Sequence, residues 1–302
     1  MNEPMRKYMR VGIVNFMAFP ATMKGEGPIL EATRAICRDD YFDVIEVTWI
    51  KDPEARKQVR KMVDTAGLTL TYGSQPRMLT TGSNINDLDD AKRKAALDSL
   101  KEGIDEAYEL GAKGFAFLSG KWADDTKDKS YAALYDSTAQ LCEYAASKGD
   151  MPVVLEVFDY DFDKKSLIGP APLARKFADD VKTKYHNFGL MVDLSHIVQI
   201  HETIRENILP IAPYIRHAHI ANAVLKAGAE AVGDMHPRFG FPNSEIAVEE
   251  VMEFLSVLLD IGYLNTKNPP IVSFEVKPWG DEDPEFVIAN AKRVLNEAWA
   301  RL

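Results

Sequence analysis

Residues 188–221 read FGLMVDLSHIVQIHETIRENILPIAPYIRHAHIA and combine two apolar runs with a stretch of helical character between them. The runs at 188–194 and 215–221 are nearly continuous in apolar residues, which is typical of strands buried on both faces of a parallel sheet. The apolar residues of 200–212 recur with helical spacing. The segment therefore predicts a strand–helix–strand unit, and the same pattern repeats along the chain.

Six further apolar runs predict strands, at 10–18, 42–48, 68–73, 114–119, 152–158 and 270–276. Amphipathic stretches predict the other helices, at 28–38, 53–66, 88–111, 130–148, 170–184, 244–262 and 284–300. Four glycines follow helices where a left-handed C-cap is expected, namely Gly67, Gly111, Gly149 and Gly262. Eight strands alternating with eight helices predict an α/β fold, a single (β/α)8 TIM barrel that forms one domain over residues 1–302.

A doubly wound sheet is the alternative architecture. It is disfavoured because no GxGxxG follows the first strand, where a dinucleotide-binding fold would carry it. No linker separates two domains. The basic residues ahead of 11–19 resemble the start of a signal peptide, but this run is short, contains Asn15 and lacks a cleavage site. A buried first strand is the favoured interpretation.

Composition excludes several classes of partner. The formal net charge is −10, which disfavours nucleic acid because an acidic surface repels phosphate. No apolar run approaches the 18 or more residues that a membrane span needs. The two cysteines, Cys37 and Cys142, do not form a CxxC pair. We therefore expect a cytoplasmic protein in a reducing compartment.

Four titratable residues stand late in the last four predicted strands. They are Glu156 in PVVLEVF, Asp193 in GLMVDLSH, His219 in IRHAHIAN and Glu275 in IVSFEVK. A charged group inside an apolar run is costly unless it is paired or bound to a metal. Three oxygen ligands and one nitrogen suit Mn²⁺ or Mg²⁺, with Co²⁺, Fe²⁺ or Zn²⁺ as alternatives.

Structural salt bridges are the competing explanation for each residue taken alone. For all four together this explanation is disfavoured, because too few basic residues lie at the same level to neutralise three carboxylates. The pattern therefore predicts a metal site at the carboxyl ends of the strands, where barrel enzymes place their active sites.

These motifs resemble the xylose isomerase-like TIM-barrel superfamily over essentially the whole chain. The resemblance rests on Glu156 in LEVFD, Asp193-x-x-His196 in VDLSH, His219 in HAHIAN and Glu275 in SFEVKP. It implies that Glu156, Asp193, His219 and Glu275 bind a divalent metal, with Mn²⁺ favoured. It also implies that His196 contacts substrate or a second metal, and we expect it beside the first metal at the floor of the pocket.

Further residues near the predicted site have open roles. Asp234-Met235-His236 resembles a D-x-H element that holds an additional metal with His196 in the nuclease branch, but it could be a loop hydrogen-bonding pair. Arg238 could hold a substrate oxygen, Lys277 could stabilise negative charge, and Trp122 could stack on a sugar; each could equally be structural. His217 faces the same way as His219 one layer deeper, and we interpret it as a core histidine with a hydrogen-bond partner.

The resemblance leaves several activities open. An endonuclease of the DNA-repair type needs additional histidines from early strands, yet all six histidines lie at position 186 or later. A non-catalytic binding protein would leave the predicted metal ligands unexplained. Carbohydrate chemistry remains, in which a metal and a nearby base, here His196, Glu156 or Glu275, allow removal of a proton next to a sugar ketone.

The VGIVNFMAFP start and the LEVFDYDFDKK loop resemble the barrel (α) subunit of bacterial C-glycoside deglycosidases. The favoured activity is therefore cleavage of the C–C bond of 3-oxo-C-glucosides. The apolar HIANAVLKAG segment after the seventh strand suits an aromatic aglycone, with Ala221, Ala223, Val224 and Leu225 expected to form an apolar wall. Substrate contacts are expected from His236, Arg238, Lys277 and Trp122. The resemblance implies a small β-rich partner subunit, and we expect an oligomer. A ketose or inosose isomerase or 3-epimerase is the alternative.

Overall fold

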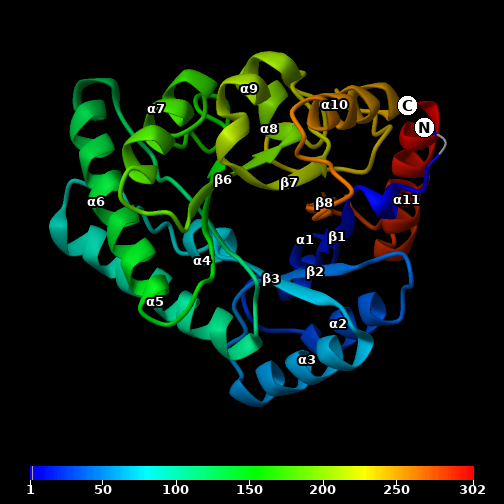
Figure 1. The fold of residues 1–302 in the computed structure, drawn as a ribbon, viewed down its shortest axis with the longest axis horizontal. Coiled ribbons are helices and arrows are strands. Elements are labelled where there is room, and N and C mark those ends of the chain that lie inside the picture. The colour runs from blue at the N-terminus through cyan, green and yellow to red at the C-terminus, as the bar shows by residue number, and fades with distance from the viewer. Residues whose placement is uncertain (2) are drawn as a thin grey trace.

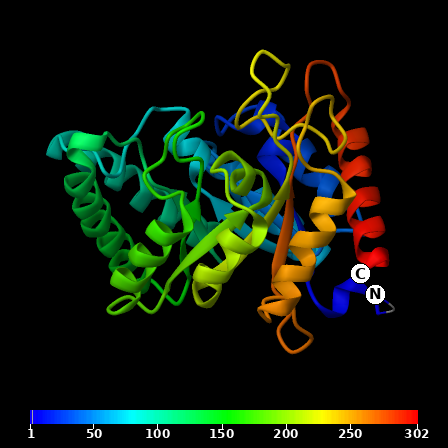
Figure 2. The ribbon, with the colours of Figure 1, turned by 90° about the horizontal axis from the view of Figure 1, so that it is seen from above.

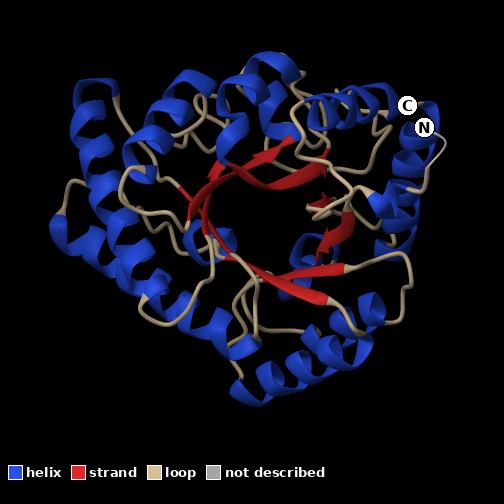
Figure 3. Cartoon of the chain, viewed as in Figure 1, coloured by secondary structure: helices blue, strands red, loops and turns tan. Residues whose placement is uncertain are grey.

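The computed structural model describes Met1 and residues 3–302, and its eight strands close into a barrel. All neighbouring strands are parallel, and the first strand pairs with the last. Figure 3 shows the strands as an inner ring surrounded by helices. The strands are β1 (Arg10–Val14), β2 (Val44–Val47), β3 (Thr69–Gly73), β4 (Phe115–Leu118), β5 (Val153–Val157), β6 (Phe188–Asp193), β7 (Ile215–Ala221) and β8 (Ile271–Glu275).

The predicted (β/α)8 architecture is confirmed, and so are the eight principal helices, which form the outer ring in Figure 1. They are α2 (Ile29–Cys37), α3 (Pro53–Ala66), α5 (Asp90–Leu110), α6 (Lys127–Ala146), α7 (Ala171–Lys182), α9 (Ile204–Ile211), α10 (Val248–Asp260) and α11 (Pro284–Arg301). Three shorter helices follow strands directly: α1 (Asn15–Ala18), α4 (Gln75–Leu79) and α8 (Leu194–Gln199). The 3₁₀ turns are Met5–Lys7, Pro20–Thr22, Asp124–Thr126 and Ala212–Tyr214.

Two local predictions are wrong. The expected strand at 10–18 ends at Val14, and the buried residues that follow form α1. A short buried helix and a buried strand are both continuously apolar, so periodicity cannot separate them. Gly149 is not a helix cap, because α6 ends at Ala146 and is followed by Ser147, whereas Gly67, Gly111 and Gly262 adopt the expected positive φ.

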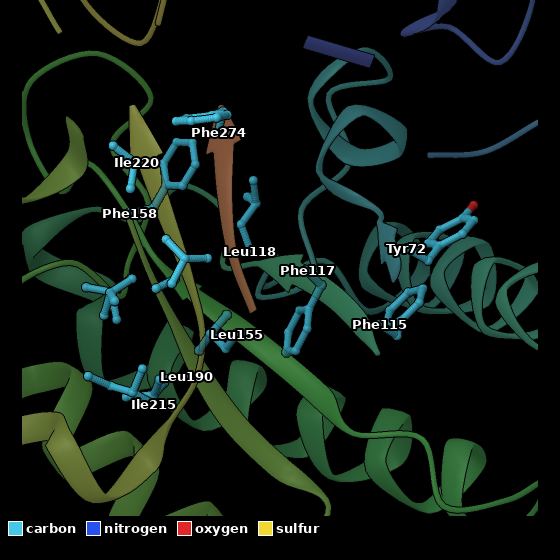
Figure 4. Close-up of a cluster of buried hydrophobic side chains, with 14 of the residues drawn as sticks. Tyr72, Phe115, Phe117, Leu118, Leu155, Phe158, Leu190, Ile215, Ile220 and Phe274 are labelled. Carbon is cyan, nitrogen blue, oxygen red and sulfur yellow. The ribbon is translucent and has the colours of Figure 1, made fainter. Parts of the chain in front are cut away.

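The large side chains of the strands point outward and pack against the helices. Figure 4 shows a cluster of buried hydrophobic side chains that includes part of this layer, and in it the Tyr72 and Phe115 rings stack with their centroids 5.5 Å apart. The barrel interior holds smaller apolar groups, with Ala116, Val154 and Met191 forming a separate cluster. Because side chains alternate along a strand, Glu156 and Asp193 share the inward face with Val154 and Met191.

The loops after the strands gather at one end of the barrel. Figure 2 shows the yellow loop after β7 and the orange-red loop after β8 rising on the same side. The termini lie together at the opposite end in this view, where the Met1 amino group donates a hydrogen bond to the Trp299 carbonyl at 3.0 Å. No helix in the described part of the chain is long and apolar enough to cross a bilayer.

Candidate metal centre

Glu156, Asp193, His219 and Glu275 meet at the carboxyl ends of β5 to β8. Each offers one ligand atom, and these four atoms all lie within 4.8 Å of one another. Glu156, Asp193 and His219 are at least 98 % buried, while the Glu275 side chain is 13 % exposed. The structure therefore brings together all four residues that were predicted to form a metal site.

Local contacts orient two of these carboxylates. The Asp193 Oδ1 atom accepts a hydrogen bond from the Ser195 backbone N–H at 2.6 Å, so that Asp193 caps α8. The Glu156 Oε2 atom accepts a hydrogen bond from Gln75 Nε2 at 2.8 Å, and Gln75 begins α4 after β3. In each case one carboxylate oxygen is held and the other is left for a different partner.

The remaining oxygens fit a cation. Glu156 Oε1 and Asp193 Oδ2 are buried and have no hydrogen-bond partner. Buried carboxylate oxygens without partners are costly, and a divalent ion among them would remove that cost. A set of three carboxylates and one imidazole suits Mn²⁺, Mg²⁺ or a related hard or borderline cation.

Without a cation, His219 balances part of this negative charge. Its Nδ1 atom lies 2.7 Å from Glu275 Oε2 and 3.7 Å from Asp193 Oδ2. Burial alone lowers the pKa of His219, but the Glu46 and Glu275 carboxylates raise it well above the ordinary value. Burial raises the pKa of Glu275. A cation held by Nδ1 would take the place of a proton on that atom.

A second cluster adjoins the first and consists of His196, Asp234 and His236. His236 Nε2 lies 2.5 Å from Asp234 Oδ1, and His196 Nε2 lies 3.9 Å from the same oxygen. The Asp234 carboxylate is the main reason that the pKa of His236 is raised to about 10 against the effect of burial. These three residues could hold a cation, or they could remain an ion pair with a neighbouring imidazole.

The loop after β5 and the loop after β7 are hydrogen-bonded to each other next to this second cluster. Asp159 accepts hydrogen bonds from the backbone N–H groups of Phe162 at 2.7 Å and Asp163 at 2.6 Å, which folds the loop after β5. The Asp163 Oδ2 atom then accepts a hydrogen bond from the Asp234 backbone N–H at 3.0 Å. Lys164 lies between Asp163 and Asp234, at 2.6 Å and 3.6 Å.

A cavity of about 210 Å³ opens onto the first cluster. Of the four predicted ligands, only Glu156 and Glu275 line it. Its polar lining includes His236, Lys164 and Lys277. The cavity thus gives a small molecule access to two carboxylates of the cluster.

The sequence model of the xylose isomerase-like TIM barrel family matches residues 35–297. The chain belongs to this family. No curated protein matches the sequence at a significant level.

Several solved structures share this xylose isomerase-like barrel at low sequence identity. D-psicose 3-epimerase from Clostridium cellulolyticum H10 is 19 % identical with a TM-score of 0.65, covering 97 % of this chain and 96 % of the epimerase. D-allulose 3-epimerase from Methylomonas sp. is 17 % identical with a TM-score of 0.71, and the match covers 99 % of this chain and 100 % of the Methylomonas enzyme. The E. coli 3-keto-D-glucoside 4-epimerase is 17 % identical with a TM-score of 0.68, and the match covers 95 % of this chain and 99 % of the E. coli enzyme. At these identities the likeness shows the fold.

The other predicted site residues fall into two groups. His236 and Lys277 line the cavity. His196 does not line it: the ring is 1 % exposed, lies 3.4 Å from Glu156 Oε1, and packs against the Phe158 ring at a centroid distance of 3.8 Å. The expectation that His196 forms the pocket floor is therefore wrong in position, although the ring adjoins the cluster.

Arg238 and Trp122 lie outside the cavity lining. Arg238 forms an ion pair with Glu282 at 2.8 Å and lies over the Phe241 ring. Trp122 stacks on Tyr160 with ring centroids 4.4 Å apart. These partners come from other loops, and the expected substrate contacts of both residues stay predictions.

The expected apolar wall is also displaced. Ala221, Ala223 and Val224 are fully buried, and Val224 packs with Phe241 instead of facing the cavity. The apolar lining comes from other segments, namely Phe16, Met17, Met23, Pro76, Leu79, Phe158 and Met235. Loops after β1, β3, β5 and β7 therefore share this wall.

Three polar residues of the site were not predicted from sequence. Gln75 begins the short helix α4 and Lys164 lies in the loop after β5, and no apolar run marks either polar residue as unusual. Glu46 stands inside the apolar VIEV segment of β2, which is the same signal that identified Glu156. His217, interpreted as a core histidine with a partner, does have one, because its Nε2 lies 2.7 Å from Glu46 Oε1.

Proposed function

We propose that this protein is a divalent-metal-dependent sugar epimerase or isomerase that removes a proton next to the ketone of a ketose or oxo-sugar. The observation that carries the proposal is the double role of Glu156 and Glu275. Both belong to the four-residue cluster and both line the cavity. A substrate bound there would contact the two carboxylates.

The metal site of this proposal consists of Glu156, Asp193, His219 and Glu275, with Mn²⁺ as the favoured ion. A divalent ion in that position would polarise the carbonyl and hydroxyl oxygens of the sugar. The unpartnered buried oxygens of Glu156 and Asp193 support this placement.

Two bases on different sides of a sugar can invert a carbon centre. β5 and β8 are separated by β6 and β7 in the ring of strands, so Glu156 and Glu275 approach the cavity from different directions. One carboxylate would take the proton from one face of the carbon, and the other would return a proton to the opposite face. Return of the proton to the neighbouring carbon by a single base would give isomerisation instead.

The remaining residues of the cavity have supporting roles in this proposal. Lys277 and Lys164 bring positive charge to the cavity, which stabilises negative charge that develops on the substrate oxygens. His236 lines the same cavity and would hold a hydroxyl group. His196, which is buried behind Phe158, would keep Glu156 in position and exchange protons with it.

Sugar conversion tests the proposal. The metal-loaded protein is incubated with D-psicose, D-tagatose, L-ribulose and a 3-oxo-glucoside, and the products are separated by chromatography. We expect at least one sugar to convert to its epimer or aldose. Glu156→Gln and Glu275→Gln should each lower kcat by at least about a hundredfold, which is the lower range for loss of an acid–base group. Glu282→Gln, outside the cavity, is the matched control.

Failure of every sugar to convert would refute the proposal for these substrates. Retention of the wild-type rate by either glutamine variant would remove that carboxylate from the mechanism, since a side-chain amide does not act as a base near neutral pH.

The apolar wall supports a second candidate function, the cleavage of 3-oxo-C-glycosides. Phe16, Met17 and Leu79 offer little to a free hexose but would accommodate an aromatic aglycone. After proton removal next to the ketone, the C–C bond to the aglycone would break and the aglycone would leave with a proton. This function would involve a small β-rich partner subunit.

Aglycone release distinguishes the two functions. Incubation with a 3-oxo-C-glucoside and Mn²⁺, with any protein that copurifies, should yield free aglycone only if the second function holds. In that case Leu79→Ser should raise KM for the glycoside, while Leu209→Ser, on the exposed side of α9, should not. Epimer formation without aglycone would leave the epimerase or isomerase as the function.

A further inference from the structure

Glu46 is a buried carboxylate that lies inside the barrel without a basic residue at ion-pair distance other than two histidines among the described residues. It is 3 % exposed and comes from β2, across the barrel from β7. Its Oε1 atom lies 2.7 Å from His217 Nε2 and 3.2 Å from His219 Nε2. A carboxylate can only accept hydrogen bonds, so both Nε2 atoms donate to it.

The ring of His219 is consequently held at both nitrogens. Nε2 donates to Glu46, and Nδ1 faces Glu275 and Asp193 in the four-residue cluster. The Nδ1 atom is thereby the one available to a cation. A flipped ring would place Nε2 toward the cluster and would leave the Glu46 carboxylate with His217 alone.

His217 braces this arrangement. Its ring stands nearly perpendicular to that of His219, at 87° and a centroid distance of 5.0 Å. Because His217 and His219 are two residues apart on β7, their side chains point to the same face of the strand. His217 thus fixes the Glu46 carboxylate from one side, and the carboxylate fixes His219 from the other.

We propose that Glu46, braced by His217, is a positioning residue that orients His219 for metal binding. The proposal rests on the metal site of the proposed function and adds to it the group that determines which nitrogen faces the ion. Metal-binding histidines that donate their second N–H to a carboxylate are better ordered and more basic ligands, and loss of the carboxylate costs about 10- to 100-fold in metal affinity.

An alternative role for the same residues is a separate ion site. Single atoms of Glu46, His217 and His219 lie within 4.8 Å of one another. An ion there would compete for His219 Nε2 and displace both hydrogen bonds to Glu46, which disfavours this role. The two roles differ in the number of ions bound.

The test is a Mn²⁺ titration of metal-free full-length protein by calorimetry. Glu46→Gln should weaken Mn²⁺ binding about 10- to 100-fold without changing the number of ions bound. Glu106→Gln is the matched control: Glu106 is a similarly buried carboxylate, 2.8 Å from Arg77, and belongs to none of the three clusters of candidate ligands. This control should lose thermal stability but keep wild-type Mn²⁺ affinity.

A second readout follows His219 directly. In protein labelled with ¹⁵N-histidine and loaded with diamagnetic Mg²⁺ or Zn²⁺, the Nε2–H of His219 should give a hydrogen-bonded, slowly exchanging signal that Glu46→Gln weakens or removes. If Glu46→Gln does not fold, His217→Gln supplies the test, because it keeps the carboxylate but removes its brace. The expected result is a smaller, several-fold loss of Mn²⁺ affinity.

Wild-type Mn²⁺ affinity in the folded Glu46→Gln and His217→Gln variants would overturn the proposal. Loss of one ion per chain, with the other bound as tightly as before, would also overturn it in favour of a separate ion site. Failure of the wild-type protein to bind any Mn²⁺ would refute the proposed metal site itself, which is a different outcome.

Discussion

Asp193 uses its two carboxylate oxygens for different purposes. Oδ1 caps α8 through the Ser195 N–H, and Oδ2 is buried without a hydrogen-bond partner in the cluster. Burial alone raises the pKa of Asp193, but the charges of His196, His236 and His219 lower it, so the group is ionised. One residue therefore couples the end of β6 to the proposed metal site.

This division predicts the behaviour of Asp193→Asn. Asparagine caps helices about as well as aspartate, so α8 should form and the protein should fold. The variant loses an anionic ligand, so its Mn²⁺ content after dialysis should fall at least about tenfold. Metal analysis and circular dichroism check the two parts. Asp52→Asn, at the cap of α3, is the control and should change neither.

The His236–Asp234 pair predicts a pH dependence. Folded His236 has a pKa raised to about 10, whereas an unfolded histidine titrates near about 6.5. The pair's contribution to the free energy of unfolding is therefore complete below about pH 6.5 and is lost as pH rises toward 10.

Denaturation in chelator between pH 6.5 and 10 measures this effect. The free energy of unfolding should fall more steeply with pH in the wild type than in His236→Asn. His186→Asn, whose ring is exposed, should keep the wild-type slope. Identical slopes in the wild type and His236→Asn would contradict the proposed pairing.

The sequence signal at the residue scale is a charged group within an apolar run. It identifies Glu156, Asp193, His219 and Glu275, and it is equally present at Glu46. Loop residues have no such signal. The pairing of Arg238 with Glu282, for example, depends on how two loops meet, which the local sequence does not specify.

Among the secondary-structure elements, the loops after β5 and β7 depend on each other. Gly233 has a φ of +95°, and a Cβ at this position would lie 2.7 Å from the Asp163 carboxylate oxygen that accepts the Asp234 N–H. The glycine therefore permits a close approach between the two loops, which places Asp234 and His236 beside the cavity.

Gly233→Ala should disrupt this contact between the two loops. We expect a loss of about 1–3 kcal/mol in the free energy of unfolding from the strained φ, together with weaker substrate binding at the cavity. Chemical denaturation and KM measure the two effects. Gly228→Ala is a matched control in the same loop, because its φ is also positive but no atom lies within 4 Å of the added Cβ. Equal KM changes in both variants would contradict a role for the contact between the two loops in substrate binding.

Sequence periodicity predicts long elements better than short ones. The eight principal helices each show two or more turns of amphipathic spacing, and all eight were predicted. The helices α1, α4 and α8 have four to six residues, too few to show a helical period. Their importance is positional, because α4 begins with Gln75 and α8 carries His196.

For the whole molecule, the alternation of strands and helices was sufficient to predict the barrel. The barrel then determines which chain segments meet, since the carboxyl ends of all eight strands lie at one end. The four predicted ligands could therefore be grouped from sequence. The shape of the cavity could not, because its apolar lining combines side chains from loops after β1, β3, β5 and β7.

The central claim is that metal-bound protein removes a proton next to a sugar ketone. Solvent exchange tests it most directly: sugars and 3-oxo-glucosides are incubated in D₂O with the Mn²⁺-loaded protein, and deuterium incorporation is measured by mass spectrometry. We predict one deuterium on the carbon beside the ketone, abolished by chelator and by Glu156→Gln or Glu275→Gln. Conversion of a substrate without deuterium incorporation, or incorporation that persists in the variant lacking both carboxylates, would contradict the account.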